Sequence, residues 1–320
     1  SSDRRPAPPT PEPVLCAGSE INPQRLFLQQ LGSDRAIIKW RGNQDGDEEA
    51  ASVCFGTDMN ALTEDSLTEA TVTATGHSEA LLTGLEPDTT YYYSIGGAGS
   101  SSAMRSFRTA PETGELPADG NTRIWIVGDS GTASEGKDGS VLVRDGYLSW
   151  VEANGGEPAD LFLMLGDNAY PEGTDEQHQI AVFDVYPAIL STTGLWPTIG
   201  NHEMGSLGIS VSADPDSYTL LGEGEPDPSP DSPLPYLNIH TLPTQAENGG
   251  VASGTEQYYA FDYGNVHIVS LDSQLSNRDP VQRGAMRDWL VDDLSQNRLD
   301  WTVVIFHHPV YSKGENHDSN

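Results

Sequence analysis

The chain has 320 residues, enough for two domains of ordinary size, and no apolar run in it approaches the length of a membrane span. Its formal net charge is −32, from 48 acidic and 16 basic residues. This charge argues against nucleic acid as a partner, because its phosphates need a basic surface, and the overall field does not attract anionic substrates. A hydrated acidic surface is favoured over a calcium-binding one, because the Asp-rich loop typical of calcium-binding proteins is absent.

The two cysteines alone do not decide the cellular compartment. Cys16 and Cys54 could form one disulfide in an exported protein or stay as free thiols in a cytosolic one. The pair is too sparse for a zinc cluster. We expect an exported protein, whether secreted, periplasmic or on the cell surface, in which a Cys16–Cys54 disulfide ties the start of the chain to the domain that follows.

The first part of the chain has the pattern of an all-β domain. Residues 1–20 are a Pro-rich lead-in, predicted to be extended or flexible. Strands are predicted within residues 21–110, at 36–40, 52–55, 71–75 and 106–109, and residues 85–93 are predicted as a turn that enters a further strand. This spacing indicates a β-sandwich. Tyr91 follows a Pro-Asp turn, as a tyrosine corner does, and the segment resembles a fibronectin type III domain. Core packing is favoured for Trp40 and Tyr91 over a role in a binding face.

The pattern changes to α/β after a linker at residues 111–121, which is rich in Pro, Gly and acids. Strands are predicted at 124–127 and 161–165 with a helix at 141–151 between them, a crossover that implies parallel strands. Further strands are predicted at 195–199 and 302–306, with a meander at 258–263 and 266–271. No regular structure is expected in residues 205–256.

A longer helix is predicted to begin at Pro280, with Asp279 as its N-cap. Its apolar residues recur at helical spacing, which predicts that one side of the helix packs on a sheet. The residues of this stripe are Val281, Ala285, Met286, Trp289, Leu290 and Leu294.

Four of the apolar runs lead directly into polar groups that can bind metal ions. The runs are followed by Gly-Asp-Ser-Gly (128–131), Gly-Asp-Asn-Ala-Tyr (166–170), Gly-Asn-His-Glu (200–203) and His-His-Pro (307–309). Because the carboxyl ends of parallel strands lie along one edge of a sheet, these groups should converge there. A mixed set of oxygen and nitrogen ligands suits iron, manganese or zinc.

Each of these residues has an ordinary structural explanation when it is taken alone. An aspartate such as Asp129 or Asp167 at a strand end is most often a cap. Asn201 could be a turn residue, Tyr170 a packing residue and His307 a hydrogen-bonded core histidine. The recurrence of such groups after four strands is hard to explain in this way, so the pattern favours a metal site.

The four blocks resemble four of the five signature blocks of the calcineurin-like metallophosphoesterases. Tyr170, three residues after Asp167, makes the sequence more similar to the purple acid phosphatases, in which a fibronectin-like domain commonly precedes the catalytic one. The resemblance thus covers nearly the whole chain. It implies an all-β fibronectin III-like sandwich at 21–110, then an α/β metallophosphoesterase sandwich of sheets flanked by helices at 122–320, incomplete at its C-terminal end.

The resemblance also implies a ligand set for two metal ions. Asp129 and Tyr170 would bind the first ion, which is ferric iron in that family. Asp167 would bridge both ions. Asn201 and His307 would bind the second ion, which would be Zn, Mn or Fe(II).

Three histidines are candidates for the catalytic step. The resemblance places His202 over the substrate phosphate. His308 and His317 are further candidates for stabilising charge or protonating the leaving oxygen. Glu203, the neighbour of His202, is expected to orient its ring.

The fifth block of the family, Gly-His-x-His, has no counterpart after His307, and the remaining histidines lie in other sequence contexts: His77, His178, His240 and His267. We therefore expect the chain to be the N-terminal part of a longer gene product. Its C-terminal segment would supply Gly-His-x-His, either as a continuation of the chain or as a cleaved piece that stays bound.

The predicted function is a dinuclear hydrolase of phosphate esters, similar to an acid phosphatase. In the mechanism that the resemblance implies, a metal-bound or metal-bridging hydroxide attacks phosphorus in line with the leaving group. Two alternatives remain open from the sequence. A phosphodiesterase or nucleotidase could use the same ligands, since pocket shape separates these activities. A non-catalytic surface or adhesion protein could keep the phosphatase-like part as a scaffold.

Overall fold

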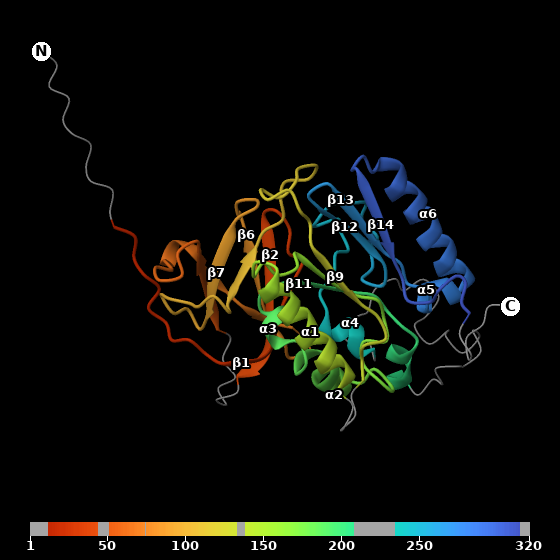
Figure 1. Ribbon diagram of the computed structural model, residues 1–320, viewed down its shortest axis with the longest axis horizontal. Coiled ribbons are helices and arrows are strands. Elements are labelled where there is room, and N and C mark those ends of the chain that lie inside the picture. The colour runs from red at the N-terminus through yellow and green to blue at the C-terminus, as the bar shows by residue number, and fades with distance from the viewer. Residues whose placement is uncertain (1–11, 44–50, 74, 133–137, 208–233, 314–320) are drawn as a thin grey trace, which may run out of the picture.

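The computed structural model describes residues 12–43, 51–73, 75–132, 138–207 and 234–313, and these ranges contain three β-sheets and several helices (Figure 1). The largest sheet has the strand order β5-β6-β2-β1-β11-β10-β9. The other two sheets have the orders β4-β3-β7-β8 and β12-β13-β14. The first strands are β1 (Pro23–Gln29), β2 (Arg35–Asn43), β3 (Ser52–Gly56), β4 (Leu67–Glu69), β5 (Thr71–Val72), β6 (Ser78–Thr83), β7 (Thr90–Ile95) and β8 (Ser106–Arg108), with a short 3₁₀ helix η1 (Glu64–Ser66) before β4.

The N-terminal strands form a β-sandwich, as the sequence predicted. Trp40 is buried in the core between its two sheets. The hydroxyl of Tyr91 accepts a hydrogen bond from the backbone N–H of Glu86 at 2.9 Å, which confirms the tyrosine corner. Cys16 and Cys54 form a disulfide, so the start of the described chain is tied to β3.

The sandwich shares its largest sheet with the rest of the molecule. Strand β1 pairs antiparallel with β2 on one side and parallel with β11 (Gly194–Pro197) on the other, where Leu28 lies opposite Gly194. Figure 1 shows β11 next to the N-terminal strands. The sequence did not predict this pairing, because strand pairing between distant segments leaves no local signal.

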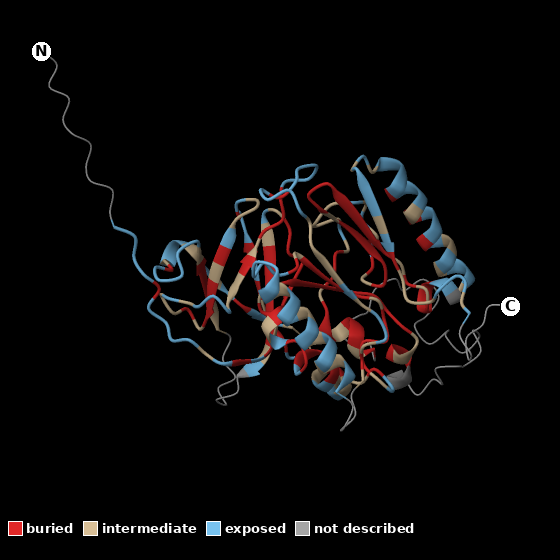
Figure 2. Ribbon diagram, viewed as in Figure 1, coloured by how far each residue is buried: buried red, intermediate tan, exposed pale blue. Residues whose placement is uncertain are grey.

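The second part of the chain has two facing sheets between helices. Strands β9 (Ile124–Val127), β10 (Leu161–Met164) and β11 run parallel. They face the sheet of β12 (Tyr259–Tyr263), β13 (Val266–Ser270) and β14 (Trp301–Ile305), in which β13 and β14 are parallel. Trp196 of one sheet stacks on Phe261 of the other, with ring centroids 3.7 Å apart. Figure 2 shows the buried strands between more exposed helices.

Helices cover the outer faces of these two sheets. The β9-β10-β11 face is covered by α1 (Gly139–Ala153), η2 (Gln179–Phe183) and α3 (Pro187–Leu190), with α2 (Asp175–His178) immediately before η2. The ring of Tyr147 on α1 stacks on Trp125 of β9 at 4.3 Å. The outer face of the three-stranded sheet is covered by α6 (Pro280–Gln296), which follows the short α5 (Leu275–Arg278). None of the helices in the described ranges has the length and apolarity that a bilayer crossing demands.

The start of α6 is as predicted, whereas its packing is only partly so. The side chain of Asp279 caps the helix by accepting hydrogen bonds from two backbone N–H groups of the first turn. Met286 and Trp289 are buried against the sheet, but Val281 and Leu294 are 63% and 40% exposed. The stripe is covered only in the middle of the helix, because the contact surface that β12 and β13 offer is shorter than the helix.

The prediction of no regular structure in residues 205–256 is wrong for the part that the structure describes. The 3₁₀ helix η3 (His202–Leu207) extends into this region, and α4 (Pro235–Ile239) lies in the core between the sheets. The hydroxyl of the fully buried Tyr236 donates to the Pro197 carbonyl at 2.9 Å. The helix α4 has too few turns for its apolar residues to show a recognisable helical spacing in the sequence. Residues 208–233 lie outside the described residues.

Candidate metal centre

The predicted ligands converge where the strands of both sheets end. Asp129 follows β9, Asp167 follows β10, Asn201 follows β11 and His307 follows β14. The carboxyl ends of parallel strands meet at this edge, as expected for the ligand site of an α/β sheet. Ligand atoms of Asp129, Asp167 and His307 all lie within 4.8 Å of one another.

Tyr170 joins this group through its hydroxyl. The oxygen lies 2.9 Å from Oδ1 of Asp129 and 2.9 Å from Oδ2 of Asp167. Burial raises the pKa of Tyr170, and the negative charge of Asp167 raises it further. One hydroxyl hydrogen faces two carboxylates here, so a cation placed between these oxygens would offset their mutual repulsion.

The ring of His307 is oriented so that one nitrogen faces the oxygens of the site. Nδ1 donates to the carbonyl of Leu165 at 2.8 Å, because a carbonyl can only accept. Nε2 lies 3.1 Å from Oδ1 of Asn201 and 3.4 Å from Oδ1 of Asp167. A neutral ring would point a lone pair at both oxygens, so either a proton or a cation is needed between them.

The pKa values reflect this need for positive charge. Burial opposes the charged form of His307, but the hydrogen bond with Asp167 outweighs it and raises the pKa of His307 to about 9. Burial likewise opposes the charge of Asp167, and the hydrogen bond from His307 outweighs it and lowers the pKa of that carboxyl. Carboxylate, amide, phenol and imidazole donors thus surround a point where a hard or borderline cation fits.

The backbone at the two aspartates adopts an uncommon conformation. Asp129 and Asp167 both have φ of 52°, in the left-handed region that costs energy for residues with a side chain. The neighbouring glycines allow the close approach of loops. A Cβ on Gly166 would lie 2.7 Å from Nδ1 of His307, and a Cβ on Gly200 would lie 2.2 Å from the Asp167 nitrogen.

Glu203 supports the loops that carry the ligands, a role the sequence did not suggest. Its fully buried carboxylate accepts hydrogen bonds from the backbone N–H groups of Asp167 at 3.1 Å, Asn168 at 2.6 Å and Gly200 at 2.6 Å. Burial raises its pKa to about 7, with a contribution from the charge of Asp167. The ring of His202 is oriented by the Pro171 carbonyl, which accepts from Nδ1 at 2.7 Å. The only feature of the sequence that could have indicated this role is the position of Glu203, a carboxyl group two residues after the predicted ligand Asn201.

The three candidate catalytic histidines differ in position. His202 lies beside Tyr170, with ring centroids 4.4 Å apart, and its Nε2 is 3.9 Å from Oδ2 of Asp167. The ring of His308 lies 4.8 Å from the ring of His307, and its Nδ1 is hydrogen-bonded to Ser273 at 2.9 Å. His317 lies outside the described residues.

Comparison with known proteins defines the class to which this fold and site belong. The sequence profile of the calcineurin-like phosphoesterases matches residues 122–320, so the chain belongs to that family. The profile of the purple acid phosphatase N-terminal domain matches residues 23–109, which confirms the resemblance to this branch and the order of a β-rich part before an α/β part.

The chain is similar to several plant phosphatases. The chain is 24% identical to probable purple acid phosphatase 20 of Arabidopsis thaliana over 92% of its length and 60% of the relative. It is 25% identical to phosphoenolpyruvate phosphatase of Allium cepa over 93% of its length and 56% of the relative. The chain therefore spans little more than half the length of these relatives. A solved structure titled "Structure of PhoD" shares the fold, with a TM-score of 0.55, 15% identity and coverage of 90% of this chain and 63% of that chain.

Proposed function

We propose that this chain forms the metal-binding part of a dinuclear hydrolase of phosphate esters, similar to an acid phosphatase. The observation that carries the proposal is the position of the Tyr170 hydroxyl, 2.9 Å from both Asp129 and Asp167, with His307 on the other side of Asp167. Two bound cations would supply the positive charge that holds a phosphate and the activation of a water molecule.

The arrangement supports a particular division of ligands. Oδ2 of Asp167 faces Tyr170, whereas Oδ1 of Asp167 faces His307. One carboxylate thus reaches toward two half-sites, and this supports the assignment of Asp167 as the bridge. Asp129 and Tyr170 would hold ferric iron, and Asn201 and His307 would hold Zn, Mn or Fe(II).

The position of His202 supports a role for this residue in proton transfer. Its Nδ1 donates to the Pro171 carbonyl, so Nε2 is the nitrogen that faces the carboxylates. In the hydrolysis, the water oxygen bonds to phosphorus and releases one proton, and the bond from phosphorus to the alcohol oxygen breaks. The alcohol oxygen takes a proton from Nε2 of the doubly protonated His202 ring, and the proton released by the water replaces it. The hydrogen bond of its backbone N–H to Oδ1 of Asp167 at 2.9 Å fixes His202 relative to the carboxylate.

Metal analysis of three variants tests the ligand assignment. We expect about two ions per wild-type chain. Asp167→Asn should lose both ions, because it removes the bridge, whereas Asp129→Asn should lose only the ion beside Tyr170. Asp292→Asn, a change of an exposed carboxylate on α6, should keep both ions. A wild-type chain that binds no metal and hydrolyses neither phenyl phosphate nor diphenyl phosphate would contradict the proposal. If diphenyl phosphate is hydrolysed faster than phenyl phosphate, the protein is a phosphodiesterase and not a phosphomonoesterase.

We also propose that a C-terminal segment of the same gene product completes the site with Gly-His-x-His. In the described residues β9 and β14 are the edge strands of their sheets, and apolar side chains on them are exposed: Ile126 by 47%, Trp301 by 66% and Val304 by 39%. Such edges are liable to aggregate unless another strand covers them. Mass spectrometry of the native protein should detect the segment bound to residues 1–320. A stable, metal-loaded species with the mass of these residues alone would refute this.

Export is the last part of the proposal. The disulfide between Cys16 and Cys54 supports it, because such bonds persist mainly in oxidising compartments. Thiol titration of the denatured, unreduced protein should find neither cysteine reactive. Two reactive thiols in protein isolated from its natural source would argue for a reducing compartment.

A further inference from the structure

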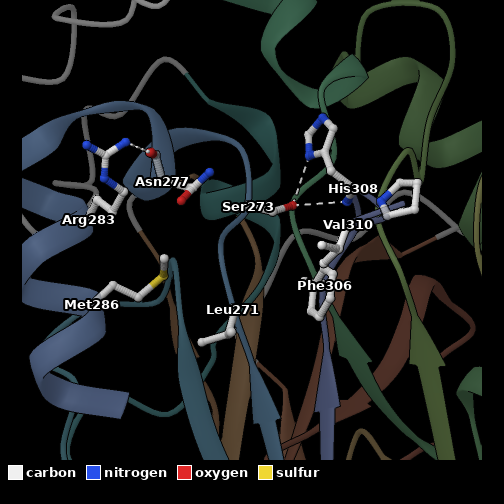
Figure 3. A pocket seen from close by; sticks show the side chains of 9 residues that line it. Leu271, Ser273, Asn277, Arg283, Met286, Phe306, His308 and Val310 are labelled. Carbon is white, nitrogen blue, oxygen red and sulfur yellow. Dashed lines mark hydrogen bonds between the residues drawn. The ribbon is translucent and has the colours of Figure 1, made fainter. Parts of the chain in front are cut away.

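A pocket of about 690 Å³ opens between α6 and the segment that follows β14. Figure 3 shows its arrangement: Leu271, Met286 and Phe306 form an apolar floor, and Arg283 stands on the side opposite Ser273 and His308. The volume is within the range of about 300–1,000 Å³ that is typical of small-molecule sites. An apolar floor with a few polar groups at the rim is the usual composition of such sites.

The pocket lies at the same sheet edge as the metal centre. Its residues Leu271 and Phe306 directly follow the parallel strands β13 and β14, and the metal ligand His307 follows Phe306. The ring of His308 lies 4.8 Å from that of His307. His308 is thus a wall of the pocket on one side and a neighbour of the metal ligand on the other.

Ser273 holds this wall in place. Its Oγ is 2.9 Å from Nδ1 of His308 and also accepts the backbone N–H of His308 at 3.1 Å. These two hydrogen bonds join the end of β13 to the end of β14. The boundary between the pocket and the metal centre is therefore a fixed side chain.

Arg283 supplies positive charge to a pocket in a strongly acidic chain. Among the described residues, its guanidinium makes one hydrogen bond, a 3.3 Å contact to the Asn277 carbonyl, so most of its five N–H donors remain available to a ligand. Arg287, one turn further along α6, is instead paired with Asp288 at 2.6 Å. Arg283 therefore has the geometry and the capacity to bind a carboxylate.

We propose that this pocket binds the alcohol part of the substrate while the phosphate lies at the metal centre. The preferred substrates are phosphate monoesters with a flat apolar body and a carboxylate at the far end, which Arg283 binds. The apolar body packs on Met286 and Phe306, where the thioether and the ring favour an aromatic group. This inference rests on the proposed function and names its substrate class.

The test compares two esters that differ only in the carboxylate, phenyl phosphate and 4-carboxyphenyl phosphate. The wild-type protein should show a kcat/KM roughly tenfold higher for the carboxylated ester, the effect of one charge-assisted hydrogen bond. Arg283→Gln should lower this ratio to near one. The matched control Arg287→Gln, on the same helix, should keep the wild-type ratio.

Binding of the product 4-hydroxybenzoate, measured by calorimetry, separates this inference from the proposed function. Wild-type and Arg287→Gln proteins should bind it, and Arg283→Gln should bind it roughly tenfold more weakly. If neither ester is hydrolysed but this binding pattern is observed, the proposed function is wrong, whereas binding of the carboxylate in the pocket by Arg283 is confirmed. Equal ratios and equal binding in wild type and Arg283→Gln overturn the inference, as does an equal loss in both arginine variants. Absence of 4-hydroxybenzoate binding to the wild type also overturns it.

Discussion

At the scale of single residues, Tyr170 is the group whose state depends most on a cation. Without one, burial and the Asp167 charge hold its pKa above the ordinary value, so the phenol stays protonated. A ferric ion between Tyr170 and Asp129 would reverse this balance, because its charge favours the phenolate. Tyr170 would then be a phenolate, and its complex with ferric iron would absorb visible light.

The first prediction follows from this reversal. The iron-loaded wild-type protein should absorb visible light through charge transfer from the phenolate to ferric iron, and Tyr170→Phe should abolish the band. The fold should be retained, because the change removes only the hydroxyl of a partly exposed side chain. Visible spectroscopy of iron-loaded protein makes the measurement. Tyr92→Phe, in the N-terminal sandwich, is the control and should keep the band; a wild type that binds iron without colour would exclude the assignment.

The second prediction concerns Glu203. Glu203→Gln keeps the shape of the side chain but replaces one acceptor oxygen with an NH₂ group, which would face a backbone N–H of Asp167, Asn168 or Gly200. We expect about 10- to 100-fold weaker metal binding and a loss of about 1–3 kcal/mol in the free energy of unfolding. Metal titration and denaturant unfolding measure these effects. Glu152→Gln on the exposed side of α1 is the control, and unchanged metal affinity in Glu203→Gln would refute the positioning role.

At the scale of elements, a buried ion triad attaches α6 to its sheet. Nδ1 of His267 on β13 lies 2.7 Å from Asp262 on β12, and its Nε2 lies 2.7 Å from Asp293 on α6. Burial opposes the charged ring, but hydrogen bonds to both carboxylates outweigh it and raise the pKa of His267 to about 9. The helix is thus held by a charge as well as by Met286 and Trp289.

The third prediction gives the pH range in which this attachment weakens. A histidine whose pKa is higher in the folded than in the unfolded protein stabilises fully below about pH 6.5, and this contribution disappears as the pH rises to about 9. The loss should be on the order of 3 kcal/mol. Denaturant unfolding of wild type and His267→Gln at pH 6 and pH 9 measures it. The variant should be less stable at pH 6 and should lose less stability than wild type between pH 6 and pH 9; an equal slope in both proteins would contradict the prediction.

Strands and their carboxyl ends were largely predictable, and contacts between distant elements were not. The runs at 124–127 and 161–165 are apolar enough to indicate strands, and after one glycine each is followed by a candidate ligand, Asp129 or Asp167. The second of these strands is buried, whereas the first lies at the sheet edge and is only partly buried. The helix α4 and the pairing of Leu28 with Gly194 have no such signal, because one is too short and the other depends on long-range packing. The candidate ligands could be named from the sequence for the same reason as the strands, whereas the hydrogen bonds of Glu203 and Ser273 depend on how the loops come together.

At the scale of the whole molecule, the contact between the sandwich and the α/β part contains several buried basic groups. His178 of α2 is fully buried, and its ring lies 6.3 Å from that of the buried His240. Other groups face this cluster from the packed elements: His77, Lys39 and Arg25 from the sandwich, and Asp175 of α2, which is paired with Arg25 at 2.7 Å. Burial lowers the pKa of His178 to about 4, so it is uncharged in the folded protein at neutral pH.

The fourth prediction is a loss of stability in acid from this contact. Because the pKa of His178 is lower in the folded than in the unfolded protein, its contribution to stability is complete above about pH 6.5 and is lost as the pH falls to about 4. His77, with a pKa lowered to about 3 by burial, acts in the same direction. Unfolding experiments between pH 7 and 4 should show a smaller decrease in His178→Gln than in wild type. Identical decreases in both proteins would mean that His178 does not contribute.

The pairing of β1 with β11 has a consequence for how the protein is made. Strand β1 leaves the ribosome long before the segment that contains Gly194 has been synthesised. The edge of β1 that pairs with β11 is therefore unpaired until that segment is made. During this interval Leu28 and the other apolar residues of β1 are open to contact with other nascent chains. Slow translation between these two segments should therefore lower the yield of native protein, whereas binding of a chaperone to the early strands should raise it.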